Sequence, residues 1–104
     1  MNTYFVYFMS NETNTTIYVG VTNNLERRVF EHKNSINQNS FTSKYRCYKL
    51  VWFEEHNDIN EAIAKEKKIK NWKREWKVNT IEILNPNWLD LAIDWKTYEY
   101  GFAN

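Results

Sequence analysis

The sequence is poor in the residues that build disulfides, zinc sites and membrane spans. Its 104 residues include a single cysteine, Cys47, which excludes an intrachain disulfide and a cysteine-based zinc site. Apolar runs are brief, and the N-terminal "MNTYFVYFMS" has no basic leader, so neither a signal peptide nor a membrane span is expected. These absences predict a cytoplasmic protein without a membrane partner, in which Cys47 is buried and inert.

The length and composition predict one compact domain over residues 1–104. We expect a core over about 3–84, followed by a helical extension over about 87–104. Aromatic residues make up 17% of the chain, including five tryptophans. Large flat side chains can pack in a core or stack on nucleobases, and composition does not decide between the two.

The net charge of +1 conceals an uneven distribution of charge. Residues 65–77, "KEKKIKNWKREWK", hold seven basic residues against two acidic ones, and we call this stretch the basic segment. Residues 78–104 hold one basic residue against four acidic ones. A polyanion would be attracted to the basic segment first, although a lysine-rich helix face is more often only a solvated surface.

Two runs of β-branched and aromatic residues, Thr3–Met9 and Thr16–Thr22, are separated by "SNETNT" and predict a hairpin. In the second run, Ile17, Val19 and Val21 share one face by strand alternation, which places Tyr18 on the opposite, polar face.

The segment "TNNLERRVFEHK" predicts a helix with Asn23 as its N-cap. Arg28 and His32 are four residues apart and are therefore neighbours on its surface. The polar "NSINQNSFTS" that follows is typical of a loop. "CYKLVWFEEH", Cys47–His56, predicts a third strand, and its apolar centre indicates a place inside the sheet.

A long helix is predicted from an N-cap at Asp58 through about Trp76 and on to about Leu84. Glu66 falls on the apolar stripe of this helix, where a core residue is expected. The stripe consists of Ile59, Ala62, Ile63, Ile69, Trp72 and Trp76. After a break near Asn85 and Pro86, a last helix is predicted. Its cap is Asn87, and its inward residues are Trp88, Leu91, Ala92 and Trp95.

The order of these motifs resembles the GIY-YIG nuclease superfamily. Its short stand-alone branch, similar to the nuclease domain of an excinuclease, commonly reads "YVY…YIG.T.DLERR..EH…A…E..IK.W.R..K". This chain follows that pattern from Tyr4 to about Leu91. It departs from the pattern at Phe5 and Val6, where the family name has Gly and Ile. Each motif alone is weak, but the ordered set is specific.

The resemblance implies an α/β (α+β) fold with a three-stranded antiparallel sheet flanked by helices. It also implies hydrolysis of DNA phosphodiester bonds with one divalent metal ion, Mg²⁺ or Mn²⁺. Tyr7 and Tyr18 match the two motif tyrosines near the attacking water, Arg28 matches the family's phosphate-binding arginine, and Glu66 matches the metal-binding glutamate. His32 is a further catalytic candidate, because it can add to the positive field of Arg28.

DNA contacts are expected from several further residues. Gly20 lacks a side chain, which would leave room for a phosphate backbone to approach closely. The basic candidates are Arg27, Lys44, Lys70, Lys73 and Arg74. Trp72 and Trp76 are expected in the core and not as platforms for bases.

Three functions from different classes remain open at this stage. The first is a metal-dependent DNA nuclease, in repair or processing. The second is a DNA-binding module that has kept the fold without turnover, and the third is a protein-interaction domain that uses its aromatic surface. The sequence does not indicate the form of the DNA substrate. Each of the three hypotheses also allows a homodimer or a protein partner.

Overall fold

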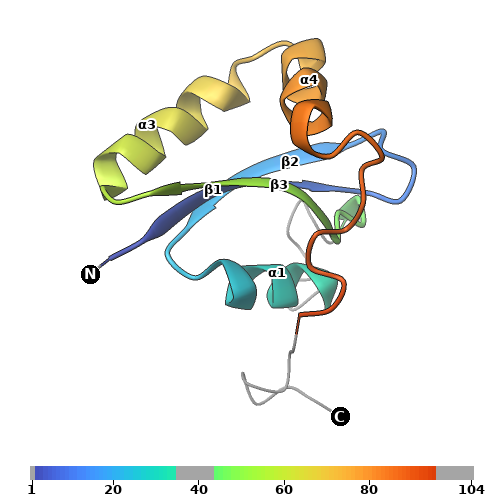
Figure 1. The fold of residues 1–104 in the computed structure, drawn as a ribbon, viewed down its shortest axis with the longest axis horizontal. Coiled ribbons are helices and arrows are strands. Elements are labelled where there is room, and N and C mark those ends of the chain that lie inside the picture. Colours follow the sequence, from blue (N-terminus) through green and yellow to red (C-terminus); the bar gives the residue numbers. More distant parts are fainter. Residues whose placement is uncertain (1, 35–43, 96–104) are drawn as a thin grey trace.

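The computed structural model describes residues 2–34 and 44–95, and it confirms the predicted α+β fold (Figure 1). The elements are β1 (Tyr4–Ser10), β2 (Ile17–Thr22), α1 (Leu25–Lys33), β3 (Lys49–His56), α3 (Ile59–Lys70) and α4 (Arg74–Leu84). Most of the predicted polar loop, and residues 96–104 of the predicted C-terminal extension, lie outside the described residues. No helix in the described ranges is long and apolar enough to cross a membrane.

The three strands form one antiparallel sheet in the order β2-β1-β3. The predicted hairpin of the first two strands is confirmed, with Tyr7 opposite Gly20 and Met9 opposite Tyr18. The prediction that the third strand lies inside the sheet is wrong, because β1 is central and β3 forms an edge. The central strand is the most deeply buried one, since Val6 through Ser10 are all fully covered.

Helices cover both faces of the sheet, with α1 on one side and α3 and α4 on the other (Figure 1). Val6 and Phe8 of β1 pack toward α3 and α4, whereas Tyr7 and Met9 pack toward α1. The face of β2 that carries Tyr18 is therefore covered by α1 and is not an open polar surface. Cys47 is buried on the α1 side, as predicted, and burial raises the pKa of its thiol to about 11.

Two predicted helix boundaries are wrong. The N-cap of α1 is Asn24, whose side chain accepts from the Arg27 backbone N–H at 3.1 Å, and not Asn23. The long helix ends at Lys70, and α4 begins after a short break. Asn71 ends α3 by donating its side-chain amide to the Lys67 carbonyl, a role that suits asparagine at a helix end.

The break between α3 and α4 changes which side chains of the predicted apolar stripe face the core. Asp58 does cap α3, and Ala62 and Ile69 are buried as expected. Ile59 and Trp76 were predicted to be inward but are 45% and 52% exposed. Trp76 belongs to α4, whose direction differs from that of α3, so helical spacing counted across the break misplaces it.

The predicted C-terminal helix is also wrong over residues 87–95, which form turns. Side-chain hydrogen bonds to β3 replace helical ones here. The buried Asn85 donates to the carbonyls of Val51 and Leu89, and Asp90 accepts from the backbone N–H of Leu50. Trp88 and Ala92 are buried as predicted and Trp95 is partly buried, but Leu91 is exposed.

Candidate active site

Three rings meet between β1, β2 and α1, and we call Tyr7, Tyr18 and His32 the ring cluster. The Tyr7 hydroxyl lies 2.9 Å from His32 Nε2, within hydrogen-bond distance. Ring centroids are 6.1 Å apart for the two tyrosines, 5.8 Å for Tyr7 and His32, and 5.4 Å for Tyr18 and His32. The structure therefore brings together three of the four residues predicted to be catalytic, from three different elements.

Gly20 makes room for this cluster. It lies opposite Tyr7 in the β1–β2 pairing, and a Cβ atom there would be 2.6 Å from both Cζ and the hydroxyl of Tyr7. It would also be 2.8 Å from Cε2 of Tyr18, and real Cβ atoms do not make such short contacts. Gly20 is itself buried, so the space left by its missing side chain is filled by the tyrosines and is not open to a phosphate.

Burial sets the charge state of the ring cluster. It raises the pKa of Tyr7 far above the ordinary value, with a further contribution from Tyr18, while Arg28 acts in the opposite direction. Burial, and then the positive charge of Arg28, lower the pKa of His32 to about 4. At neutral pH, Tyr7 is therefore protonated and His32 is uncharged. Tyr7 is also inaccessible, so it can position its neighbours but cannot touch a substrate.

Arg28 lies beside the ring cluster in a polar groove. The groove, which we call the arginine groove, is lined by Thr22, Asn23, Asn24, Arg27, Arg28 and Glu31. Glu31 forms ion pairs with both arginines, at 3.3 Å from Nε of Arg28 and 3.5 Å from Nε of Arg27. Exposed ion pairs of this kind contribute only about 0–1 kcal/mol, so a phosphate can compete for either guanidinium. The prediction that Arg28 and His32 are neighbours is confirmed by the effect of Arg28 on the pKa of His32.

A second hollow opens on the outer edge of β2, and we call it the edge pocket. It is lined by Ile17, Tyr18, Val19, Lys70 and Lys77. Tyr18 thus belongs both to the ring cluster on the α1 side and to a pocket formed with α3 and α4. Lys70 Nζ is 2.6 Å from Glu66 Oε2, which connects the predicted metal ligand to this pocket.

Lys77 was not among the residues singled out from the sequence. Burial, and then the charge of Arg74, lower its pKa. Helical spacing does not relate it to Lys70, because the break between α3 and α4 separates the two lysines. Because basic residues are spread evenly over the basic segment, the sequence did not distinguish Lys77 from the others.

Glu66 suits a divalent cation that keeps most of its water. Its side chain is 12% exposed on the inward side of α3, as the sequence indicated. Within residues 2–34 and 44–95, no three acidic, histidine or cysteine side chains are grouped to hold a metal by themselves. Mg²⁺ is commonly held by one or two carboxylates together with water and substrate phosphates, so a single glutamate is a sufficient protein ligand.

Comparison with known proteins agrees with this arrangement. Residues 3–79, well over half of the chain, match the family model described as the GIY-YIG catalytic domain. The chain belongs to the GIY-YIG family. The members of this family are nucleases that act on DNA.

A solved structure shares the fold. It is the solution NMR structure of the UPF0213 protein BH0048 from Bacillus halodurans, with a TM-score of 0.54 and 18% sequence identity. The alignment covers 88% of this chain and 97% of that one. At this identity the likeness is one of fold alone. No curated protein matches this GIY-YIG chain.

The basic residues predicted to contact DNA in this GIY-YIG domain separate into three groups. Arg27 and Lys70 line the arginine groove and the edge pocket, respectively. Arg74 instead donates from Nη1 to the Thr15 carbonyl at 3.0 Å and from Nη2 to the Asn14 carbonyl at 2.5 Å, and so holds the β1–β2 loop. The remaining two, Lys44 and Lys73, are exposed and line neither hollow.

Proposed function

We propose that this GIY-YIG protein is a divalent-metal-dependent DNA endonuclease whose site lies along the outer edge of β2. The observation that carries this proposal is the position of Tyr18. Its ring contacts His32 on one side of the sheet, and it lines the edge pocket with Lys70 and Lys77 on the other. Groups from both faces of the sheet thus meet at one exposed strand edge, where an extended DNA backbone has access.

In the proposed reaction, water attacks a DNA phosphorus and one P–O ester bond breaks, which leaves a phosphate monoester and a hydroxyl. Tyr18 orients the attacking water, and the buried Tyr7 and His32 hold its ring in place. Arg28 stabilises the negative charge that grows on the phosphate oxygens, since a guanidinium fork matches a phosphate well. A neutral phenol is a poor base, so the proposed role of Tyr18 is to orient the water and not to take its proton.

Glu66 is the residue that would hold the metal ion, which supplies Lewis-acid stabilisation when bound. Glu66 is paired with Lys70, and this lysine would be free to contact a DNA phosphate if the carboxylate held a cation instead. Lys77 lines the same pocket and would contact the same stretch of DNA backbone. We place the activity in DNA repair or processing.

The test is cleavage of labelled single-stranded, duplex and branched DNA with Mg²⁺, Mn²⁺ or EDTA. Glu66→Gln keeps the shape of the side chain and removes its charge, so we expect cleavage to fall at least about 100-fold, the scale of losing one key electrostatic group. Glu61→Gln, an exposed change on the same helix, is the control and should leave cleavage intact. A fully active Glu66→Gln protein would disprove the assignment of this residue.

One observation favours the DNA-binding module as the second candidate. Lys70 pairs with Glu66 at 2.6 Å, which is the arrangement expected of a structural ion pair. A protein that binds DNA in EDTA and cleaves none of the three substrates with either metal would establish that function instead.

A further inference from the structure

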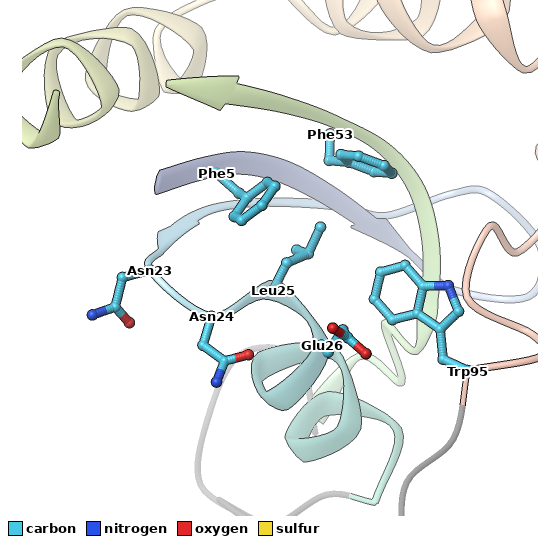
Figure 2. Close-up of a pocket in the computed structure, with 7 residues that line it drawn as sticks. All are labelled: Phe5, Asn23, Asn24, Leu25, Glu26, Phe53 and Trp95. Atoms are coloured by element: carbon cyan, nitrogen blue, oxygen red, sulfur yellow. The ribbon is translucent and has the colours of Figure 1, made fainter. Parts of the chain in front are cut away.

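A cavity lined by aromatic rings lies on the α1 side of the sheet, beyond the ring cluster (Figure 2). Its volume is about 490 Å³, within the range of small-ligand pockets. We call it the aromatic pocket. It is lined by Phe5, Asn23, Asn24, Leu25, Glu26, Phe53 and Trp95. In Figure 2 the rings of Phe5, Phe53 and Trp95 surround the Leu25 side chain, and the Glu26 carboxylate lies between Leu25 and Trp95.

The pocket shares a sheet face with the ring cluster. Phe5 is two residues before Tyr7 on β1, and Phe53 of β3 is the direct cross-strand partner of Tyr7. The rings of Phe5 and Phe53 meet edge to face at 6.2 Å. Phe53 remains 38% exposed. The large ring at Phe5, where the family name has glycine, therefore helps to form this cavity next to the site.

The aromatic pocket also adjoins the arginine groove, because Asn23 and Asn24 line both. A nucleotide whose phosphate is held by Arg28 would therefore have its base beside the aromatic rings. The opposite arrangement is disfavoured, since the carboxylate of Glu26 would repel a phosphate placed in the aromatic pocket.

The lining chemistry matches a nucleobase. A base has two flat faces that stack on aromatic rings, and its edge carries N–H groups that a carboxylate accepts, as in contacts to cytosine N4. A base inside a duplex presents neither face, because both faces are covered by its neighbours in the stack. Only an unpaired or extruded base can enter.

We propose that the aromatic pocket receives one unpaired nucleobase of the substrate, next to the phosphate held by Arg28. The proposal rests on the nuclease function above. It adds a preference for DNA that is single-stranded, at least at one nucleotide beside the cleaved bond.

Binding in EDTA tests the pocket separately from cleavage. Phe53→Leu and Trp95→Leu remove one ring each, and we expect each to weaken binding of a labelled oligothymidylate about tenfold, as measured by fluorescence anisotropy. Binding of a duplex should change less than twofold. Tyr48→Leu is the matched control, because Tyr48 is 36% exposed and lies just before β3 but does not line the pocket. This variant should bind both DNAs as tightly as the wild type does.

An abasic strand of the same length completes the experiment. Wild type and Phe53→Leu should bind it equally, because the base that contacts the ring is missing. The pocket proposal would be overturned if the ring variants lost the same amount of affinity for the single strand, the duplex and the abasic strand. It would also be overturned if they lost no affinity for any of the three. If wild type cleaves DNA while the ring variants bind all DNAs normally, only the pocket proposal fails. If wild type neither binds nor cleaves any DNA, the nuclease function fails with it.

Discussion

The two sides of the β2 edge are built differently. On the α1 side, Tyr7, Tyr18 and His32 are rigid rings in mutual contact, and Tyr7 is completely buried. On the α3–α4 side, Lys70 and Lys77 are long flexible chains, and Lys70 is held by an ion pair with Glu66.

This difference separates two tasks of the proposed site. A packed cluster keeps one geometry before the substrate arrives, which favours orientation of the attacking water. Flexible charged chains can exchange one partner for another, which suits the binding of a phosphate and a cation. Changes to the ring cluster should therefore lower activity by displacing the residues that orient the reaction, whereas changes to Lys70 or Lys77 should weaken DNA binding by one phosphate contact each.

The largest effect is expected from Gly20→Ala. The new methyl group would meet the phenol of Tyr7 at 2.6 Å and force its ring away from His32. Overpacking of a core typically costs about 1–3 kcal/mol, and we expect the free energy of unfolding to fall by this amount. Because Tyr18 loses its support, cleavage should fall at least about 100-fold, the scale associated with misplaced catalytic groups.

Val21→Ala is the control for this change. Val21 is the next residue on β2, but its side chain packs against the core on the α3–α4 face. Its loss should lower stability, measured by denaturant unfolding, and leave cleavage by the folded protein nearly unchanged. If Gly20→Ala behaves like Val21→Ala, the ring cluster has no role beyond packing.

Stability should depend on pH through His32. Its pKa is lowered to about 4 in the folded protein, so the unfolded chain takes up a proton near pH 6.5, well before the folded one does. The folded state is therefore fully stabilised above pH 6.5 and loses stability as the pH falls from 6.5 toward 4. Allowing for solvent on its exposed side, we expect a loss of roughly 2 kcal/mol from this residue.

Denaturant unfolding between pH 7 and pH 4 measures this loss. His32→Gln keeps a hydrogen-bonding group near Tyr7 but cannot titrate, so its stability should fall less over the same interval. The chain has one other histidine, His56, which pairs with Glu54 at the end of β3. His56→Gln is the matched control, in which the loss of stability caused by His32 should persist. An unchanged slope in His32→Gln would contradict the assignment.

The sequence predicted the α1 side well because its signals are local. Strand alternation and the four-residue spacing of Arg28 and His32 fix which side chains face each other, whatever the rest of the fold does. The family pattern added the pairing of the two tyrosines. Spacing alone did not reveal the reason for Gly20, since its contact with Tyr7 crosses two strands.

The α3–α4 side was predicted less well because its geometry depends on a break that no glycine or proline marks. Asn71 ends α3 through one side-chain hydrogen bond, and the apolar spacing continues across it. Counting through the break made Trp76 a core residue, although it is 52% exposed. In the same way, the hydrogen bonds of Asn85 and Asp90 to β3 replaced the expected C-terminal helix with turns.

The smallest effect distinguishes two basic residues of the α3–α4 side, Lys77 and Arg74. Lys77 lines the edge pocket, so Lys77→Met should weaken DNA binding about tenfold at moderate salt. It should also reduce the slope of log affinity against log salt by about one, the value for one lost phosphate contact. Arg74 is occupied by the carbonyls of Asn14 and Thr15. Arg74→Met should therefore lower the free energy of unfolding by about 1 kcal/mol, the scale of a lost hydrogen bond, and leave the salt slope in place.

Titration of DNA at several salt concentrations, together with denaturant unfolding, separates these two roles. If Arg74→Met reduces the slope of log affinity against log salt and leaves stability unchanged, Arg74 contacts DNA, as its place in the basic segment first suggested. An unchanged slope in Lys77→Met would remove the edge pocket from the path of the phosphate backbone. Binding would then depend on the arginine groove, and the α1 side of the β2 edge would both orient the reaction and hold the DNA.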